Sequence, residues 1–141
     1  MNISTHGSNL IKDFEGLRLQ AYQCSADVWT IGYGHTRGVR PDDVITLEEA
    51  DNFLQLDIVD SERVVNKLVN APLTQNQFDA LVSFVFNVGE GNFSKSTLLK
   101  KINLNDYHGC AQELLRWIHS GGEGIAGLIK RREAEKTLFL K

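Results

Sequence analysis

The chain has 141 residues and a mass of 15.8 kDa, and 42% of its residues are hydrophobic, which is enough to fill one core. No apolar run reaches the ~18 residues that a membrane span needs, and the N-terminus lacks the basic and apolar stretches of a secretory signal. With a net charge of only −3, these features exclude stable membrane insertion and predict a single domain over residues 1–141.

The charge is unevenly distributed along the chain. Residues 42–62 include eight acidic side chains and no basic one, whereas residues 128–141 include five basic side chains and two acidic ones. The basic tail could attract an anionic polymer, but both clusters could equally be solvated helix faces. We expect the acidic segment to lie away from an anionic substrate. The tail carries no interleaved aromatic residues and no recognised motif, so we expect no nucleic-acid partner.

A short helix followed by strands is predicted at the N-terminus. Apolar residues recur at helical spacing after the possible caps Thr5 and Ser8, and Gly16 can supply a left-handed stop. The helix should therefore end near Glu15. Residues 19–36 mix aromatic and β-branched side chains with glycines, which favours a small antiparallel sheet.

The remainder of the chain is predicted to be mainly helical. Residues 46–49 form a capping box that opens a long amphipathic helix to about Asn70. A second box at 74–77 opens a helix that is apolar almost all round and should be central. Shorter helices are expected over 96–102, 106–119 and 125–140, with Gly121 and Gly122 between the last two.

Three polar residues stand at a characteristic spacing near the N-terminus. Eight residues separate Glu15 from Cys24, and five separate Cys24 from Thr30. This pattern resembles that of the phage-type lysozymes of glycoside hydrolase family 24. The segments 15–19, 30–35, 86–89 and 127–132 are similar to further landmarks of the family, so the resemblance spans nearly the whole chain.

The resemblance implies a fold and an activity. The fold class would be α+β, mainly α and lysozyme-like, with a small sheet lobe over about 16–60 joined by the long helix to a helical lobe of 1–15 and 61–141. The activity would be that of an endolysin, a muramidase that hydrolyses the β-1,4 bond between N-acetylmuramic acid and N-acetylglucosamine in peptidoglycan during host lysis. We expect a monomer without cofactor or metal. Its release from the host cytoplasm to the cell wall would depend on a holin-type membrane protein.

Glycoside hydrolysis explains the residue types in the pattern. It requires an acid for the leaving oxygen and a group that supports the opposite face of the sugar. Glu15 suits the acid role, and the resemblance implies that Cys24 is the base or nucleophile, where many relatives have Asp. A thiol is mostly neutral at pH 7, so the site must lower its pKa or Cys24 only packs. Thr30 could hold the attacking water, and Asp27 could substitute as base.

Other segments of the resemblance supply candidate supporting residues. Gly34, Phe86 and Asn87 match segments that line the substrate cleft, although Phe86 could instead belong to the core. We expect His35 to be a buried partner of a carboxylate rather than a catalytic group. For Arg131 the resemblance implies a guanidinium that reaches Glu15, and the alternative is a solvent-facing helix residue.

Two alternative functions remain open at this point. A catalytically weak peptidoglycan-binding protein with the lysozyme fold is made conceivable by Cys24, but Glu15 and Thr30 argue against it. A zinc amidase would need ligands from residues that show no convincing motif spacing, namely His6, Cys24, His35, His108, Cys110 and His119. We favour free thiols at Cys24 and Cys110 and leave their pairing open.

Overall fold

The computed structural model describes residues 1–24, 26–119 and 125–141. Helices dominate the described chain, and the predicted α+β, mainly α class is confirmed. In chain order the elements are α1 (Thr5–Glu15), β1 (Arg18–Gln23), β2 (Trp29–Gly32), α2 (Leu47–Leu68), α3 (Gln75–Val88), α4 (Glu90–Ser94), α5 (Thr97–Asn103), α6 (Tyr107–Leu114) and α7 (Ile125–Phe139).

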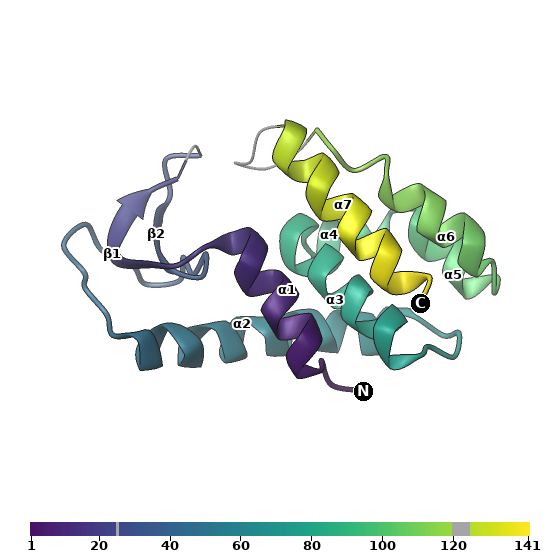
Figure 1. Cartoon of the computed structure of the whole chain (residues 1–141), viewed down its shortest axis with the longest axis horizontal. Coiled ribbons are helices and arrows are strands. Elements are labelled where there is room, and N and C mark those ends of the chain that lie inside the picture. Colours follow the sequence, from purple (N-terminus) through teal and green to yellow (C-terminus); the bar gives the residue numbers. More distant parts are fainter. Residues whose placement is uncertain (25, 120–124) are drawn as a thin grey trace.

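The long helix α2 organises the molecule. Figure 1 shows the two strands at the N-terminal end of α2 and the helices α3 to α7 gathered around its C-terminal half. Helix α3 packs against α1, α2 and α7, and all of its residues from 78 to 85 are buried. The expectation that this apolar helix is central is therefore confirmed.

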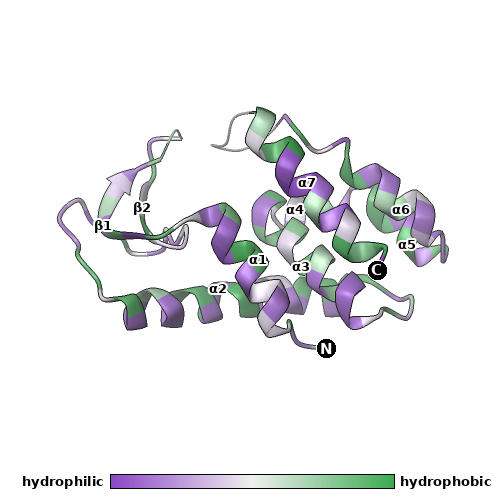
Figure 2. Ribbon diagram, in the orientation of Figure 1, coloured by the Kyte–Doolittle hydropathy of each residue, from purple (hydrophilic) through white to green (hydrophobic). Residues whose placement is uncertain are grey.

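Both predicted capping boxes are present. The Thr46 hydroxyl accepts from the Glu49 amide and the Glu49 carboxylate accepts from the Thr46 amide, each at 3.1 Å. Thr74 and Gln77 make the same reciprocal pair at the start of α3. These boxes satisfy amides that a helix N-terminus would otherwise leave without a partner. Hydrophilic and hydrophobic positions alternate along α2, as its amphipathic pattern requires (Figure 2).

The small sheet is a two-stranded antiparallel hairpin. Tyr22 pairs with Thr30 across it, and the backbone groups of Ile31 and His35 bond each other in both directions at 2.9 Å to close a tight turn. Strand β2 packs on the first turns of α2. The turn from 31 to 35 is thereby fixed between the sheet and α2.

The N-terminal cap of α1 differs from the prediction. Ser4, rather than Thr5 or Ser8, accepts from the Gly7 amide. The Ser4 amide and hydroxyl both donate to Asp79, which is fully buried in α3 and also accepts from Gln75 at 2.8 Å. This cap was not predicted because its anchor lies 75 residues further along the chain.

The C-terminal half contains two further differences. The helix expected over 106–119 ends at Leu114, where successive short-range turns bring Trp117 edge-on against Phe84 at 5.6 Å. Helix α4 was not predicted, because Gly89 ends α3 and the chain re-enters a helix immediately. Gly121 and Gly122 lie outside the described residues. Within the described ranges, no helix is both long and apolar enough to cross a membrane.

The Asp79 anchor can be tested by its effect on stability. Asp79→Ala should lower the free energy of unfolding by about 2–4 kcal/mol, because it removes the charged acceptor of two hydrogen bonds from the half-buried N-cap Ser4 and of one from Gln75. Urea unfolding followed by circular dichroism would measure the change. Asp42→Ala, at an exposed acidic residue, is the control and should change stability by less than about 0.5 kcal/mol. Equal effects of the two variants would contradict the anchor.

Candidate active site

Glu15 is the last residue of α1, and Gly16 at φ +72° turns the chain toward β1. The Glu15 side chain is largely covered, with 18% of its surface exposed. Its Oε2 accepts a hydrogen bond of 2.6 Å from Nη1 of Arg131. The structure thus brings together Glu15 and Arg131, the pair that the resemblance to phage-type lysozymes implied.

Gly34 lies against the other carboxylate oxygen. A Cβ atom built on Gly34 would be 2.6 Å from Glu15 Oε1, closer than nonbonded atoms approach, and the residue has φ +77°. Both conditions are met without strain by glycine. Gly34 is therefore required for the close approach of the sheet lobe to the carboxyl group.

Arg131 is fully buried, and so is its neighbour Arg132. The view of residues 128–141 as a solvated basic surface is therefore wrong for these two arginines, although Lys130 and Lys141 are exposed. Besides Glu15, Arg131 donates through Nη2 to the carbonyl of Ser83 at 3.2 Å. Burial of a guanidinium is costly unless it is paired, and each of these bonds offsets that cost.

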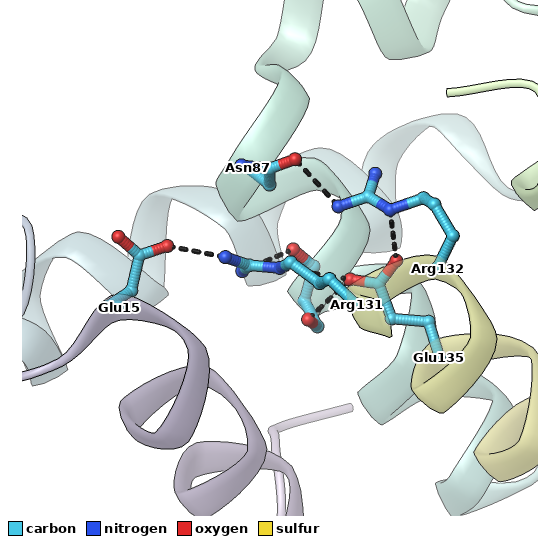
Figure 3. A network of polar contacts seen from close by, with 6 residues as sticks. Glu15, Asn87, Arg131, Arg132 and Glu135 are labelled. Atoms are coloured by element: carbon cyan, nitrogen blue, oxygen red, sulfur yellow. Dashed lines mark hydrogen bonds and ion pairs between the residues drawn. The ribbon is translucent and has the colours of Figure 1, made fainter. Parts of the chain in front are cut away.

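A buried carboxylate, Glu135, lies between the two arginines (Figure 3). Its Oε2 is 3.4 Å from Nε of Arg131 and accepts at 2.6 Å from the Ser83 hydroxyl, and its Oε1 is 2.9 Å from Nε of Arg132. Burial raises the pKa of Glu135, and the charges of Arg132 and Arg131 oppose that rise. The two guanidiniums and the Ser83 hydroxyl are the groups that favour the ionised form of this carboxyl group against its burial.

Sequence reasoning missed Ser83, Arg132 and Glu135. A signal was available on α7, because Glu135 stands three and four residues after two consecutive arginines and so shares a helical face with both. What the spacing could not show is that this face turns inward.

Cys24 follows β1, and hydrogen-bond donors of the neighbouring loop lower the pKa of its thiol. Backbone amides of Val28 and Ala26 lower the pKa of the thiol, and desolvation, which raises it, is outweighed. The hydroxyl of the buried Thr30 also reaches the sulfur and lowers the pKa further. Cys24 therefore forms a thiolate more readily than an ordinary cysteine.

Thr30 and Asp27 shape the loop around this thiol. The Thr30 hydroxyl donates to the carbonyl of Val28 at 2.9 Å, and the Asp27 amide donates to the carbonyl of Cys24 at 2.9 Å. Asp27 adopts φ +60°, a left-handed conformation that Asp tolerates in turns. The geometry supports a turn-forming role for Asp27.

His35 is buried and pairs with a carboxylate, Asp57 of α2, at 2.8 Å from Nδ1 to Oδ2. Its ring stacks on Phe53, with centroids 4.2 Å apart and planes 3° from parallel. Both partners come from the long helix. His35 thus ties the turn that carries Gly34 to α2.

A polar cavity of about 210 Å³ adjoins this turn. Gly34 and Phe86 line it together, and Phe86 also packs against the core. Asp57 and Asp60 line the same cavity. These two residues of the acidic segment 42–62 therefore lie beside the cavity next to Gly34, and the expectation that the segment lies away from the substrate stays a prediction. A larger cavity of about 460 Å³ shares Phe86 and Asp60 with it.

Asn87 is half-buried next to Phe86, and its Oδ1 accepts from Nη2 of Arg132 at 2.6 Å. The contact fixes the amide so that its NH₂ group is the donor left for another partner. Asn87 is thereby linked through Arg132 to Glu135 and the rest of the buried charge cluster (Figure 3).

The candidate catalytic residues form two contact groups. One contains Glu15, Arg131 and Gly34, and the other contains Cys24 and Thr30. Among the contacts of the described residues, none joins one group directly to the other. Such a separation is compatible with glycoside hydrolysis, in which acid and base act on opposite faces of the bond. Within the described residues no group of three or more His, Cys, Asp or Glu is placed to hold a metal ion.

The sequence of the chain is similar to that of proteins of one known family. Residues 12–135 match the family model described as phage lysozyme. The chain is 51% identical to the endolysin of Acyrthosiphon pisum secondary endosymbiont phage 1, over 99% of this chain and 98% of the relative. It is also 40% identical to the endolysin of Salmonella phage P22, over 99% of each chain.

Solved structures agree with the sequence relatives. The muramidase domain of SpmX from Asticaccaulis excentricus superposes with a TM-score of 0.92 and 46% identity, covering 99% of this chain and 98% of that one. A mutant of P22 lysozyme gives a TM-score of 0.86 and 39% identity, covering 100% and 99%. The chain thus shares both fold and sequence with proteins that are named endolysin, lysozyme or muramidase.

The contrast between the two cysteines gives a testable prediction. Both are free, but burial raises the pKa of Cys110 to about 12, whereas that of Cys24 is lowered. One equivalent of Ellman's reagent should therefore react with the native protein, at a rate that rises with pH and levels off below the pH typical of a free thiol. The second equivalent should require denaturant. Rapid labelling that persists in Cys24→Ser would contradict the assignment.

Proposed function

The chain belongs to the phage lysozyme family, and we propose that it cuts peptidoglycan with Glu15 as the general acid. It is an endolysin-type muramidase, hence a glycoside hydrolase that acts on the glycan strands of the bacterial cell wall. Family membership decides against the zinc amidase, and the lysis assay described below separates an active enzyme from a module that only binds. The roles proposed for its individual residues are supported by the geometry of the site.

The observation that carries the proposal is the placement of the Glu15 carboxyl group between Arg131 and Gly34. Because Arg131 donates to Oε2, the transferable proton belongs on Oε1, which lies against Gly34. Glu15 gives this proton to the glycosidic oxygen as the bond to the anomeric carbon breaks. The guanidinium then stabilises the carboxylate that remains, and a proton from water restores the acid.

Cys24 supplies the second group that the reaction needs. Its thiolate either removes the proton of the attacking water or attacks the anomeric carbon itself. The Thr30 hydroxyl has one proton and two acceptors within reach, the Val28 carbonyl and the Cys24 sulfur. While it donates to the carbonyl, its oxygen can accept a hydrogen bond from the water that Cys24 would activate.

The glycan strand is assigned to the polar cavities beside the site. Gly34, which lies against Glu15, lines the smaller cavity together with Phe86, and the Asn87 amide is held ready to donate to a sugar oxygen. The carboxylates of Asp57 and Asp60, which line the cavity, accept hydrogen bonds from sugar hydroxyl groups. Because these hydroxyl groups are uncharged, the acidic side chains bind them without charge repulsion.

Access to the wall completes the proposed function. We assign the protein to the host cytoplasm until a holin-type membrane protein permeabilises the membrane, and we propose that it acts as a monomer. The support is the endolysin relatives and the fact that acid, arginine and thiol all come from one chain.

Replacement of the acid tests the central assignment. Glu15→Gln keeps the shape of the side chain but has no proton to give, so the rate of clearing chloroform-treated Gram-negative cells should fall by about 10²–10⁴-fold. Near-UV circular dichroism should match the wild type. Released reducing ends should disappear in parallel. A folded variant that clears cells at the wild-type rate would refute the role of Glu15.

Substitution of the thiol tests the second group. Cys24→Ser should reduce turnover at least about tenfold, because a hydroxyl is far less acidic than a thiol. Cys24→Asp should retain much of the activity and should work best at a lower pH, since a carboxyl group ionises at lower pH than a thiol. Turbidity assays across pH 4–9 would measure both. Full activity of Cys24→Ser and Cys24→Ala would show that the thiol only packs.

A further inference from the structure

Basic side chains border the larger of the two cavities beside the candidate active site. This cavity has a volume of about 460 Å³, and the charged residues that line it are Arg37, Arg63, Lys67, Asp60 and Glu90. Its three cationic side chains outnumber its two carboxylates. Such a lining attracts an anionic group rather than an uncharged one.

The larger cavity continues into the smaller one that adjoins Gly34. Arg37, Asp60 and Phe86 line both. Arg37 stands three residues after Gly34, so the Cα atoms of these two residues are at most about 11 Å apart. Gly34 in turn lies against the Glu15 carboxyl group. A substituent on a sugar that is bound next to Glu15 is therefore within reach of the long Arg37 side chain.

The basic side chains at the larger cavity form exposed ion pairs. Asp60 is shared by two guanidiniums, because its Oδ2 lies 3.6 Å from Nη2 of Arg37 and its Oδ1 lies 3.3 Å from Nη1 of Arg63. Nζ of Lys67 lies 3.0 Å from Oε2 of Glu90. The exposed fractions of the three cationic side chains are 84%, 69% and 61%, so water weakens all three pairs. One carboxylate does not neutralise two guanidiniums, which leaves positive charge for a further anion.

We propose that the larger cavity binds a carboxylate of the peptide that N-acetylmuramic acid carries in peptidoglycan, and that Arg37 is the residue that receives it. The proposal rests on the proposed function, because the sugars must occupy the adjoining cavity. The sugar rings of the strand are uncharged, whereas the attached peptides have free carboxylates. A guanidinium binds a carboxylate through two parallel hydrogen bonds. The cavity thereby distinguishes peptide-bearing wall glycan from an uncharged polymer of N-acetylglucosamine.

Arg37 differs from the other two cations in how it is held. Arg63 lies three residues after Asp60 on α2, so their pair is local to one helix. Arg37 comes from the loop after β2 and reaches α2 at the longest of the three distances. It therefore exchanges its partner for an incoming carboxylate most easily. Lys67 lines the larger cavity but not the smaller one, so it contacts parts of the peptide further from the sugar.

Binding of defined wall fragments tests the assignment of Arg37. The probes are the disaccharide–peptide that muramidase digestion releases and the same disaccharide without its peptide, and neither is cut further. NMR titration of ¹⁵N-labelled protein gives a Kd for each probe. The wild type should prefer the peptide-bearing probe by about tenfold, and Arg37→Gln should reduce this preference about fivefold. The affinity for the peptide-free probe should not change.

Two further variants fix the sign of the effect and its place. Glu90→Gln removes the carboxylate that competes for Lys67, so it should raise the preference about twofold. Arg40→Gln is the matched control, because it removes the same charge from the same loop, yet Arg40 is not among the residues that line either cavity. The preference of this variant should equal that of the wild type. All three substitutions change exposed side chains and should leave the fold intact.

The outcomes separate this inference from the proposed function. An unchanged preference in Arg37→Gln, an equal loss in Arg40→Gln or a fall in Glu90→Gln would overturn the inference. Because the probes are not cut, these results do not depend on the identity of the catalytic acid. A Glu15→Gln variant that still lyses cells would refute the role of Glu15 and leave the assignment of the peptide carboxylate to Arg37 in place.

Discussion

The ion pair between Glu15 and Arg131 is the interaction on which the site depends. It joins residues 116 positions apart, one at the end of α1 and the other in the interior of α7. A buried guanidinium is tolerated only where its donors are met, and Glu135 and Ser83 meet those that Glu15 does not. Helices α7 and α3 supply these partners together. The packing of α7 against α3 therefore also determines where the Glu15 carboxyl group lies.

The Glu15 carboxyl group also contacts the sheet lobe, at the turn over residues 31–35. Gly34 admits the Glu15 carboxyl group to contact its backbone, and the next residue, His35, is held by Asp57 and stacked on Phe53 of α2. The turn is therefore fixed on one side by α2 and meets the acid on the other. This arrangement fixes the position of the sheet lobe relative to the Glu15 carboxyl group.

The two cysteines show how environment decides the chemistry of one residue type. Cys24 is only partly covered, and backbone amides and the Thr30 hydroxyl favour its thiolate. Cys110 lies inside the helical lobe, where burial and the nearby carboxylate of Asp106 favour the neutral thiol. The thiolate of Cys24 is therefore favoured by the loop around it, whereas that of Cys110 is disfavoured by its burial.

Local bonds account for what the sequence determined by itself. The capping boxes at 46–49 and 74–77 and the end of α1 at Gly16 depend on residues within a few positions of one another. The spacing of Glu15, Cys24 and Thr30 lies within the single segment 15–30, and the family pattern in it led to the activity. The tertiary structure alone decided the anchoring of Ser4 by Asp79 and the pairing of His35 with Asp57. It also turned the basic face of α7 inward onto Glu135 and brought part of the acidic segment to the cavity. The physical reason is that these partners are brought together by burial, and which face of a charged helix is buried depends on side chains contributed by distant segments.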